Sequence, residues 1–334
     1  MDSRYTLQLQ AAQGVGVAAQ RAVLDFVDRQ GLTLEDFFSL SPDVWRRSGL
    51  KEQQVAALAS METVSAARRW ADELAHNNIR VINLNDASYP ERLKRVLGAL
   101  APPILATWGN LQLLEKPAVG WCGSRHASEQ GIAFTEGTVR QAVERGITVV
   151  SGAAKGIDTA AHRTALASRG TTIIVAPEGI SGFRLRADIK ELASAENILI
   201  VSEFQPNAHW STANAMTRNH TIIGLSNALI VVESGLHGGT FEAGHFALKA
   251  KVPLFVAEYT EPSESAVGNV YFIQRGATSI HHNRETHHAG LQRLFDDILS
   301  HYSDLKRPLA PAMIQGLLFP DMLLADQEDT NSRG

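Results

Sequence analysis

One segment, residues 117–162, constrains the fold of this chain more than any other. It reads as an apolar run, a turn of small residues, a helical segment, a second apolar run and another turn of small residues. A strand, turn, helix and strand in this order are the repeating unit of a parallel sheet. The segment therefore predicts a Rossmann-like fold.

The same alternation continues as far as about residue 282. Predicted strands cover residues 118–122, 148–151, 171–175, 198–202, 228–233 and 252–257. Predicted helices begin at or near Ser128, Asp158, Asp188, Ala213 and Thr240. Because these strands lack polar alternation, both faces of the sheet should be covered. We expect an α/β fold with an extended, doubly wound parallel sheet.

The residues before this sheet have a helical pattern. Helical periodicity from Leu7 is interrupted by Gly-Val-Gly at residues 14–16, which predicts two helices joined by a glycine hairpin. Thr33 and Ser41 are polar residues at the starts of further helices. The pattern resembles a helix-hairpin-helix of the sterile-alpha-motif type. Such hairpins grip a DNA backbone in some proteins and serve as packing or dimer elements in others.

The periodicity changes from helix to strand at Ile79, and a short strand, a turn into a helix and a second strand lead into the main sheet. We therefore predict a helical domain over residues 1–78 and a Rossmann-like domain over residues 79–284. Residues 285–334 are predicted to form an amphipathic helix and a polar tail. His281-His282 and His287-His288 are adjacent pairs, a spacing that suits a linker better than a zinc site.

Composition limits the possible partners. The formal net charge of -4 provides no overall basic surface, so nucleic acid would have to bind a local patch. The single cysteine, Cys122, provides neither a disulfide framework nor a metal cluster, and we predict a core residue beside Trp121 rather than a reactive thiol. No apolar run suits a membrane span or a secretory signal, so we predict a cytoplasmic protein.

Two turns at predicted strand ends supply the first candidate binding residues. These residues are Gly123, Ser124 and Arg125 in the first turn, and Ser151, Gly152, Lys155 and Gly156 in the second. Glycine allows the backbone to approach a ligand, and helix N-termini that follow such turns bind anions. Glycines alone would also suit the tight turns of any doubly wound sheet. The paired cations, Arg125 and Lys155, are what indicate a phosphate-bearing ligand.

These turns also carry a family resemblance. GSRxxSxxG at residues 123–131 and SGxAxGIDxxAH at residues 151–162 resemble the signatures of the DNA-processing protein A family, DprA or Smf. The resemblance extends from about Leu7 to about Ile280. It implies binding of single-stranded DNA, loading of the RecA recombinase during natural transformation and a homodimer. It implies no cofactor and no metal. Asp158 and His162 match the second motif, and we expect them to cap and pack a helix rather than transfer protons.

A third segment, residues 206–226, departs from the family pattern. The family has a lysine, an aromatic residue and an R-N-R core before IIxGLS. This chain keeps Arg218 and Asn219 but has His220 for the second arginine, Ala215 for the aromatic residue and Thr212 near the lysine position. Because stacking on an aromatic side chain contributes about 1–3 kcal/mol per base, this loss should weaken single-strand binding. Trp210 is a candidate replacement at a different spacing.

A fourth segment departs further and suggests an alternative function. Where the family has R-S-G-S, this chain has Gly238, Gly239 and Thr240, followed by Glu242. This order partly resembles the P-G-G-x-G-T-x-x-E motif of Lonely-Guy-like nucleotide phosphoribohydrolases. That resemblance implies that Glu242 and Arg218 act on a ribose linkage. Alternatively, Glu242 is an acidic residue that complements the dipole of the following helix.

The sequence therefore leaves more than one function open. The first hypothesis is a single-stranded DNA-binding protein that makes and breaks no bond. The second is a sensor or phosphoribohydrolase that acts on a free nucleotide, and phage defence is a setting in which it would serve. The third is a scaffold whose crevice has lost its ligand.

Overall fold

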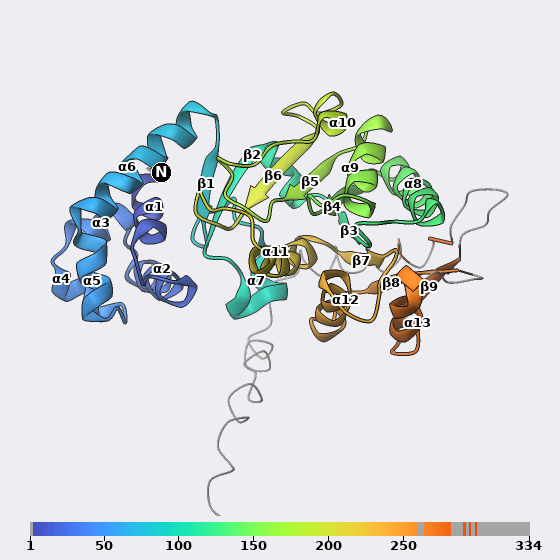
Figure 1. Ribbon diagram of the computed structural model, residues 1–334. Helices are drawn as coiled ribbons and strands as arrows, with labels where there is room; N and C mark the ends of the chain where they lie inside the picture. The colour runs from blue at the N-terminus through green and yellow to red at the C-terminus, as the bar shows by residue number, and fades with distance from the viewer. Residues whose placement is uncertain (1–2, 260–263, 282–289, 292–293, 295–297, 299–334) are drawn as a thin grey trace, which may run out of the picture.

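The computed structural model describes residues 3–259, 264–281, 290–291, 294 and 298. Its centre is one nine-stranded sheet with the order β1-β2-β6-β5-β4-β3-β7-β8-β9 (Figure 1). The strands are β1 (Arg80–Asn83), β2 (Ile104–Gly109), β3 (Ala118–Cys122), β4 (Thr148–Ser151), β5 (Thr172–Val175), β6 (Ile198–Ser202), β7 (Ala228–Val231), β8 (Leu254–Glu258) and β9 (Thr278–His281). Strands β3 to β9 are parallel.

Helices cover both faces of the sheet (Figure 1). One face carries α8 (Glu129–Glu144), α9 (Ile157–Ala167) and α10 (Ala187–Lys190). The opposite face carries α7 (Glu91–Leu97), α11 (Thr212–Leu225), α12 (Gly239–Lys249) and α13 (Val267–Ile273). Short 3₁₀ turns lie at Gly98–Leu100, Leu111–Glu115 and Glu264–Ala266. The arrangement confirms the predicted doubly wound α/β fold.

The predicted strands agree with the observed ones to within about two residues at each end. Helices α8 and α9 begin where the sequence predicts, and the Ser128 side chain caps α8 by accepting from the Gly131 amide. Two elements near the end of the sheet, α13 and β9, were not predicted. The two short strands predicted before the main sheet are β1 and β2. They belong to the same sheet, because β2 pairs antiparallel with both β1 and β6.

The N-terminal residues form the predicted helices. They are α1 (Ser3–Ala11), α2 (Val17–Gln30), α3 (Leu34–Ser39), α4 (Pro42–Arg47), α5 (Glu52–Ala59) and α6 (Met61–His76). The hairpin between α1 and α2 contains Gly14 in the left-handed region, at φ +76°. Thr33 forms a capping box with Asp36 at the start of α3, whereas Ser41 precedes α4 without a side-chain capping bond.

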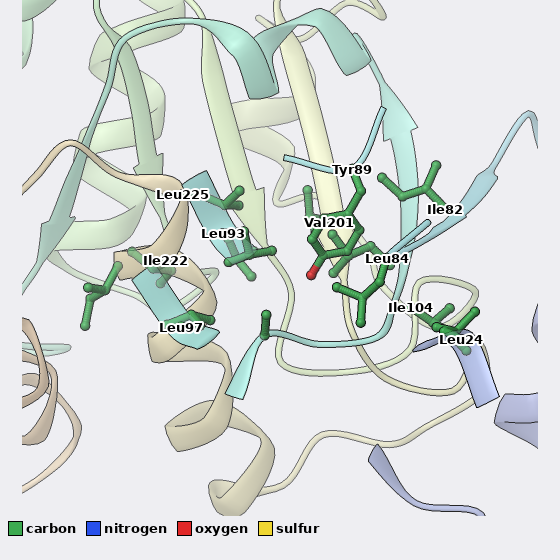
Figure 2. Close-up of a cluster of buried hydrophobic side chains, with 14 of the residues drawn as sticks. Leu24, Ile82, Leu84, Tyr89, Leu93, Leu97, Ile104, Val201, Ile222 and Leu225 are labelled. Carbon is green, nitrogen blue, oxygen red and sulfur yellow. The ribbon is translucent and has the colours of Figure 1, made fainter. Parts of the chain in front are cut away.

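The N-terminal helices pack against the edge of the sheet. Leu24 of α2 belongs to the same buried cluster as Ile82, Leu84 and Ile104 of the β1–β2 region, and Figure 2 shows it beside Ile104. The Gln205 side chain, in the loop after β6, donates to the Gln10 carbonyl oxygen at 2.7 Å. One buried apolar cluster thus extends from these helices into the sheet. The division at residues 78 and 284 stays a prediction.

The end of the chain is described only in part. Leu291, Leu294 and Ile298 are buried against the α8–α9 face, a spacing that suits one face of the predicted amphipathic helix. His281 pairs with Glu258 at 3.1 Å. His282, His287, His288 and the predicted polar tail lie outside the described residues. None of the helices that are described combines the length and the apolar character needed to cross a membrane.

Leu93 of α7 tests the packing of this core. Its side chain is fully buried between α11 and the sheet, so Leu93→Ala should lower the free energy of unfolding by about 2–5 kcal/mol. Leu192→Ala is the matched control, because Leu192 is 39% exposed and its loss should change stability by less than about 0.5 kcal/mol. Urea denaturation followed by circular dichroism measures both, and equal losses would contradict the assigned packing.

Candidate functional site

The site lies where the strand order of the sheet reverses. From β3, the chain adds β4, β5 and β6 on one side, and then returns to place β7 on the other side of β3. In open parallel sheets, ligands bind at the carboxyl ends of the strands at such a switch point. The turns after β3, β4 and β7 meet there, so both predicted glycine-rich turns lie at one crevice.

A cavity of about 470 Å³ opens beside these turns, and we call it the anion cavity. Arg125 and Lys155, both exposed, line it together with the buried Arg218. The Arg125 guanidinium lies over the Trp210 ring at 5.8 Å from its centroid. Within the part of the chain that the structure describes, neither Arg125 nor Lys155 forms an ion pair. Both cations are therefore available to an anionic ligand.

Arg218 provides the buried charge of the cavity. Its side chain is 4% exposed, and its Nη1 lies 3.8 Å from Asp158 Oδ2, which is too long for a hydrogen bond. Among the described residues, its Nε and Nη1 have no hydrogen-bond partner. Burial lowers the pKa of Arg218, and the nearby Asp158 carboxyl opposes that shift. Because a buried donor without a partner is unfavourable, these nitrogens are suited to receive a ligand oxygen.

Gly152 creates the space that Arg218 occupies. A Cβ atom at this position would lie 1.3 Å from Arg218 Nη1, so only glycine fits beneath the guanidinium. Gly123, in the first turn, and Gly156, in the same turn as Gly152, have comparable roles. A Cβ on Gly123 would lie 2.5 Å from the Ile157 side chain, and one on Gly156 would lie 2.2 Å from the Ser124 carbonyl oxygen. These glycines allow close approach within the protein and so shape the crevice.

Two carboxyl groups partly neutralise Arg218. Burial raises the pKa of Asp158, while Arg218 and the Ala154 amide lower it. Burial also raises the pKa of Glu203 to about 7, although the Thr221 hydroxyl donates to this carboxyl at 2.7 Å. A buried acid that titrates within the physiological pH range therefore lies near enough to Arg218 to interact with its charge.

The helix N-termini around the crevice differ in availability. Glu233 accepts hydrogen bonds from the amide and hydroxyl of Ser128, so a carboxylate already occupies the start of α8. Asp158 accepts from the Ala154 amide at the start of α9. Helix α12 begins after Gly238 with no side-chain cap. Helix α9 also begins without a side-chain cap, after Gly156, so α9 and α12 differ in this respect from α8.

The structure also places the remaining predicted binding residues. The Thr240 hydroxyl donates to the Gly123 carbonyl oxygen at 3.1 Å, which joins the start of α12 to the first turn. The Asn219 amide nitrogen donates to the Gly239 carbonyl oxygen at 3.1 Å and so fixes α12 against α11. The Ser124 hydroxyl oxygen accepts from the His126 amide at 3.0 Å.

Ser151 does not line the anion cavity. Its hydroxyl is buried and donates to the Trp121 carbonyl oxygen at 2.6 Å, so it joins β4 to β3. Of the predicted binding residues, Arg125, Lys155 and Arg218 line this cavity.

His162 and Cys122 are structural residues. The His162 ring is fully buried, contacts Thr172 Oγ1 at 2.6 Å and the Gly152 carbonyl oxygen at 2.7 Å, and burial lowers its pKa to about 4. A neutral ring that supports Gly152 agrees with the packing role we expected. Cys122 is half-buried, and burial raises the pKa of its thiol, which favours the neutral form.

Glu242 lies in a separate place. It is exposed in the first turn of α12 and lines a second cavity of about 430 Å³, the α11–α12 groove, together with Asn219 and His220. Arg218 lines the anion cavity. The two candidate catalytic residues of the phosphoribohydrolase hypothesis therefore face different cavities. His220 stacks on Phe246 with ring centroids 4.0 Å apart, and burial lowers its pKa, so it does not replace the cation of an arginine.

One group of residues that line the anion cavity was not predicted from the sequence. The loop between β5 and α10 contributes Phe183, Arg184 and Arg186. The alternation of aromatic, apolar and basic residues in Phe-Arg-Leu-Arg was the available signal. Glu203, which follows β6, was also missed, because a single carboxyl after a strand carries no motif.

Comparison with known proteins places the chain in a family. The model of the DNA recombination-mediator protein A family matches residues 60–289. The chain belongs to this family. The DNA processing protein DprA of Streptococcus pneumoniae is 34% identical over 194 residues, which cover 58% of this chain and 67% of that protein.

Solved structures of family members agree with this assignment. The crystal structure of DprA from S. pneumoniae matches with a TM-score of 0.70 and 26% identity over 89% of this chain and 97% of that one. A DprA from Helicobacter pylori, studied for its single-stranded DNA binding mode, matches with a TM-score of 0.54 and 23% identity over 67% of this chain and 97% of that one. The matches to S. pneumoniae DprA and to the Smf proteins of Synechocystis and Escherichia coli cover between 54% and 67% of the length of each relative.

Gly152→Ala tests the space beneath Arg218. The added methyl group should displace the guanidinium and lower the free energy of unfolding by about 1–3 kcal/mol. Gly235→Ala is the control, because its Cβ would have no neighbour nearer than the His237 carbonyl oxygen at 3.8 Å. In an Arg218→Ala background the loss should shrink, since the two positions are coupled. Additive losses in denaturation experiments would contradict this contact.

The raised pKa of Glu203 predicts a pH dependence of stability. The folded chain keeps this proton up to about pH 7, whereas its ordinary pKa is 4.5, so the folded state binds more protons between these values. The contribution of Glu203 to stability is therefore present below about pH 4.5 and lost as the pH rises to about 7. Glu203→Gln should gain melting temperature relative to the parent chain across that interval. A difference that is independent of pH would contradict the assignment.

Proposed function

We propose that this chain binds single-stranded DNA through its phosphates in the anion cavity, without making or breaking a bond. The observation that carries the proposal is the meeting of Arg125, Lys155 and Arg218 at one cavity, with donor nitrogens of Arg218 unpaired. Family membership and the H. pylori relative, whose single-stranded DNA binding mode has been described, support the choice of ligand.

A local patch reconciles this ligand with the net charge of -4. Arg184 and Arg186 line the cavity in addition to the three cations above, and Glu178 is the one carboxylate residue among its described lining residues. A phosphate backbone would therefore meet a positive surface in a chain that is acidic overall. Such binding releases counterions and weakens with salt.

We extend the proposal to the partners that the family resemblance implies. In this view the chain loads the RecA recombinase onto single strands during natural transformation and acts as a homodimer in the cytoplasm. Support for this extension is membership of the recombination-mediator family alone.

The phosphoribohydrolase alternative has less support. It needs a carboxylate and an arginine that act on the same ribose linkage, and Glu242 and Arg218 line different cavities. A position in the first turn of α12 suits Glu242 as an acid that complements the helix dipole.

Fluorescence anisotropy of a labelled oligonucleotide at several salt concentrations tests the proposal. Arg125→Ala with Lys155→Ala should reduce affinity at least about 10-fold and make the dependence on salt less steep, because two phosphate contacts are lost. Arg29→Ala with Lys51→Ala is the control, since it removes the same charge from the exposed surface of the N-terminal helices.

The controls separate the possible outcomes. If the parent chain fails to bind at low salt, the DNA proposal is wrong, and release of base from a mononucleotide by the parent chain but not by Glu242→Gln would then support the enzyme. If both double variants lose affinity equally, binding does not occur in the anion cavity.

A further inference from the structure

Trp210 is an exposed aromatic residue that lines the anion cavity. It is 49% exposed, whereas Trp45 and Trp121 are buried in the core. A large aromatic side chain at a polar, cationic cavity gains little from exposure to water. Its position needs an explanation beyond packing.

The backbone around Trp210 is held on both sides. The Ser211 hydroxyl caps α11 by accepting from the Asn214 amide at 3.0 Å, so Trp210 directly precedes a fixed helix start. The Asn214 side chain donates to the His209 carbonyl oxygen at 3.2 Å. The indole is thus presented by a stretch of backbone that is already ordered without ligand.

The loop at residues 179–181 is hydrogen-bonded to the segment that precedes Trp210. The Gly179 amide donates to the Ala208 carbonyl oxygen at 2.8 Å, and the Ser181 amide donates to the Pro206 carbonyl oxygen at 3.0 Å. A Cβ on Gly179 would lie 2.2 Å from the Gln205 carbonyl oxygen, so glycine is needed for this close approach. The two loops form one wall that fixes Trp210 relative to the strand ends.

Arg125 joins the indole to the phosphate-binding cations. Its guanidinium lies over the Trp210 ring at 5.8 Å from the centroid, and about half of the Trp210 surface remains exposed beside it. A volume of about 470 Å³ falls within the range of about 300–1,000 Å³ typical of small-molecule sites, so the cavity accommodates a nucleotide unit.

We infer that Trp210 is a base-stacking platform, on which an unpaired base of the bound strand lies while Arg125, Lys155 and Arg218 hold its phosphates. This inference rests on the proposed function and deepens it. A base in a duplex is stacked between its neighbours and cannot reach a side-chain platform, so the platform selects single strands. Every base has a π-face, so it does not select a sequence.

Matched oligonucleotides test the inference. One is a single strand with bases, and the other is an abasic strand with the same number of phosphates. Trp210→Ala should weaken binding of the strand with bases by about 5- to 150-fold, the range that base–aromatic stacking gives on alanine substitution. Binding of the abasic strand should stay unchanged, and so should the dependence of affinity on salt, because no phosphate contact is lost. Trp210→Phe should retain most of the affinity.

Two controls complete the experiment. His209→Ala changes the exposed neighbour of Trp210 and should leave both affinities unchanged. Quenching of tryptophan fluorescence by the strand with bases should be largely absent in Trp210→Phe but present in Trp70→Phe, since Trp70 lies in α6.

The outcomes distinguish base stacking on Trp210 from the proposed DNA binding on which it rests. Equal binding of the strand with bases by Trp210→Ala and the parent chain overturns the platform and leaves phosphate binding intact. An equal loss for the abasic strand also overturns it, because the residue then acts only on the shape of the cavity. Failure of the parent chain to bind either strand overturns both proposals.

Discussion

The candidate site depends on one buried guanidinium. Arg218 is held in the interior by the nearby Asp158 carboxyl and by the space that Gly152 leaves beneath it. These residues come from α11, α9 and the turn after β4, so no single segment creates the site. Two nitrogens of Arg218 have no hydrogen-bond partner among the described residues, although Asp158 lies within ion-pair distance. Because buried donors without a hydrogen bond are unfavourable, these two nitrogens are suited to an additional acceptor oxygen.

The carboxylates around the crevice already have partners within the protein. Glu233 accepts hydrogen bonds from Ser128 before α8, and Asp158 accepts from the Ala154 amide, whereas Arg125 and Lys155 form no ion pair among the described residues. This distribution also explains how an acidic chain presents a cationic surface. The exposed cations gather along one cavity, while nearby carboxylates are turned toward backbone amides and hydroxyls.

The departures from the family pattern have structural consequences. Ala215 is buried against the core, so the position where the family has an aromatic residue presents no platform to the crevice. His220 stacks on Phe246 in the α11–α12 groove and is kept neutral by burial. Trp210, placed just before the same helix, presents an aromatic surface from a different backbone position. The chain thus keeps Arg125, Lys155 and Arg218 and presents an aromatic side chain to their cavity from a different position.

The sequence by itself determined the alternation of strands and helices, because uninterrupted apolar runs and glycine-rich turns report local conformation directly. It also identified Arg125, Lys155 and Arg218, since charged residues at strand ends and in a family motif are visible without coordinates. It could not exclude Ser151 from the anion cavity or place Glu242 in another cavity, because the direction of a side chain depends on packing between distant segments. Trp210 was a candidate from the sequence, but only the tertiary structure placed it beside Arg125 and brought Phe183 to the same cavity. Their positions follow from contacts between loops that β-strand order places side by side, and sequence periodicity carries no record of that order.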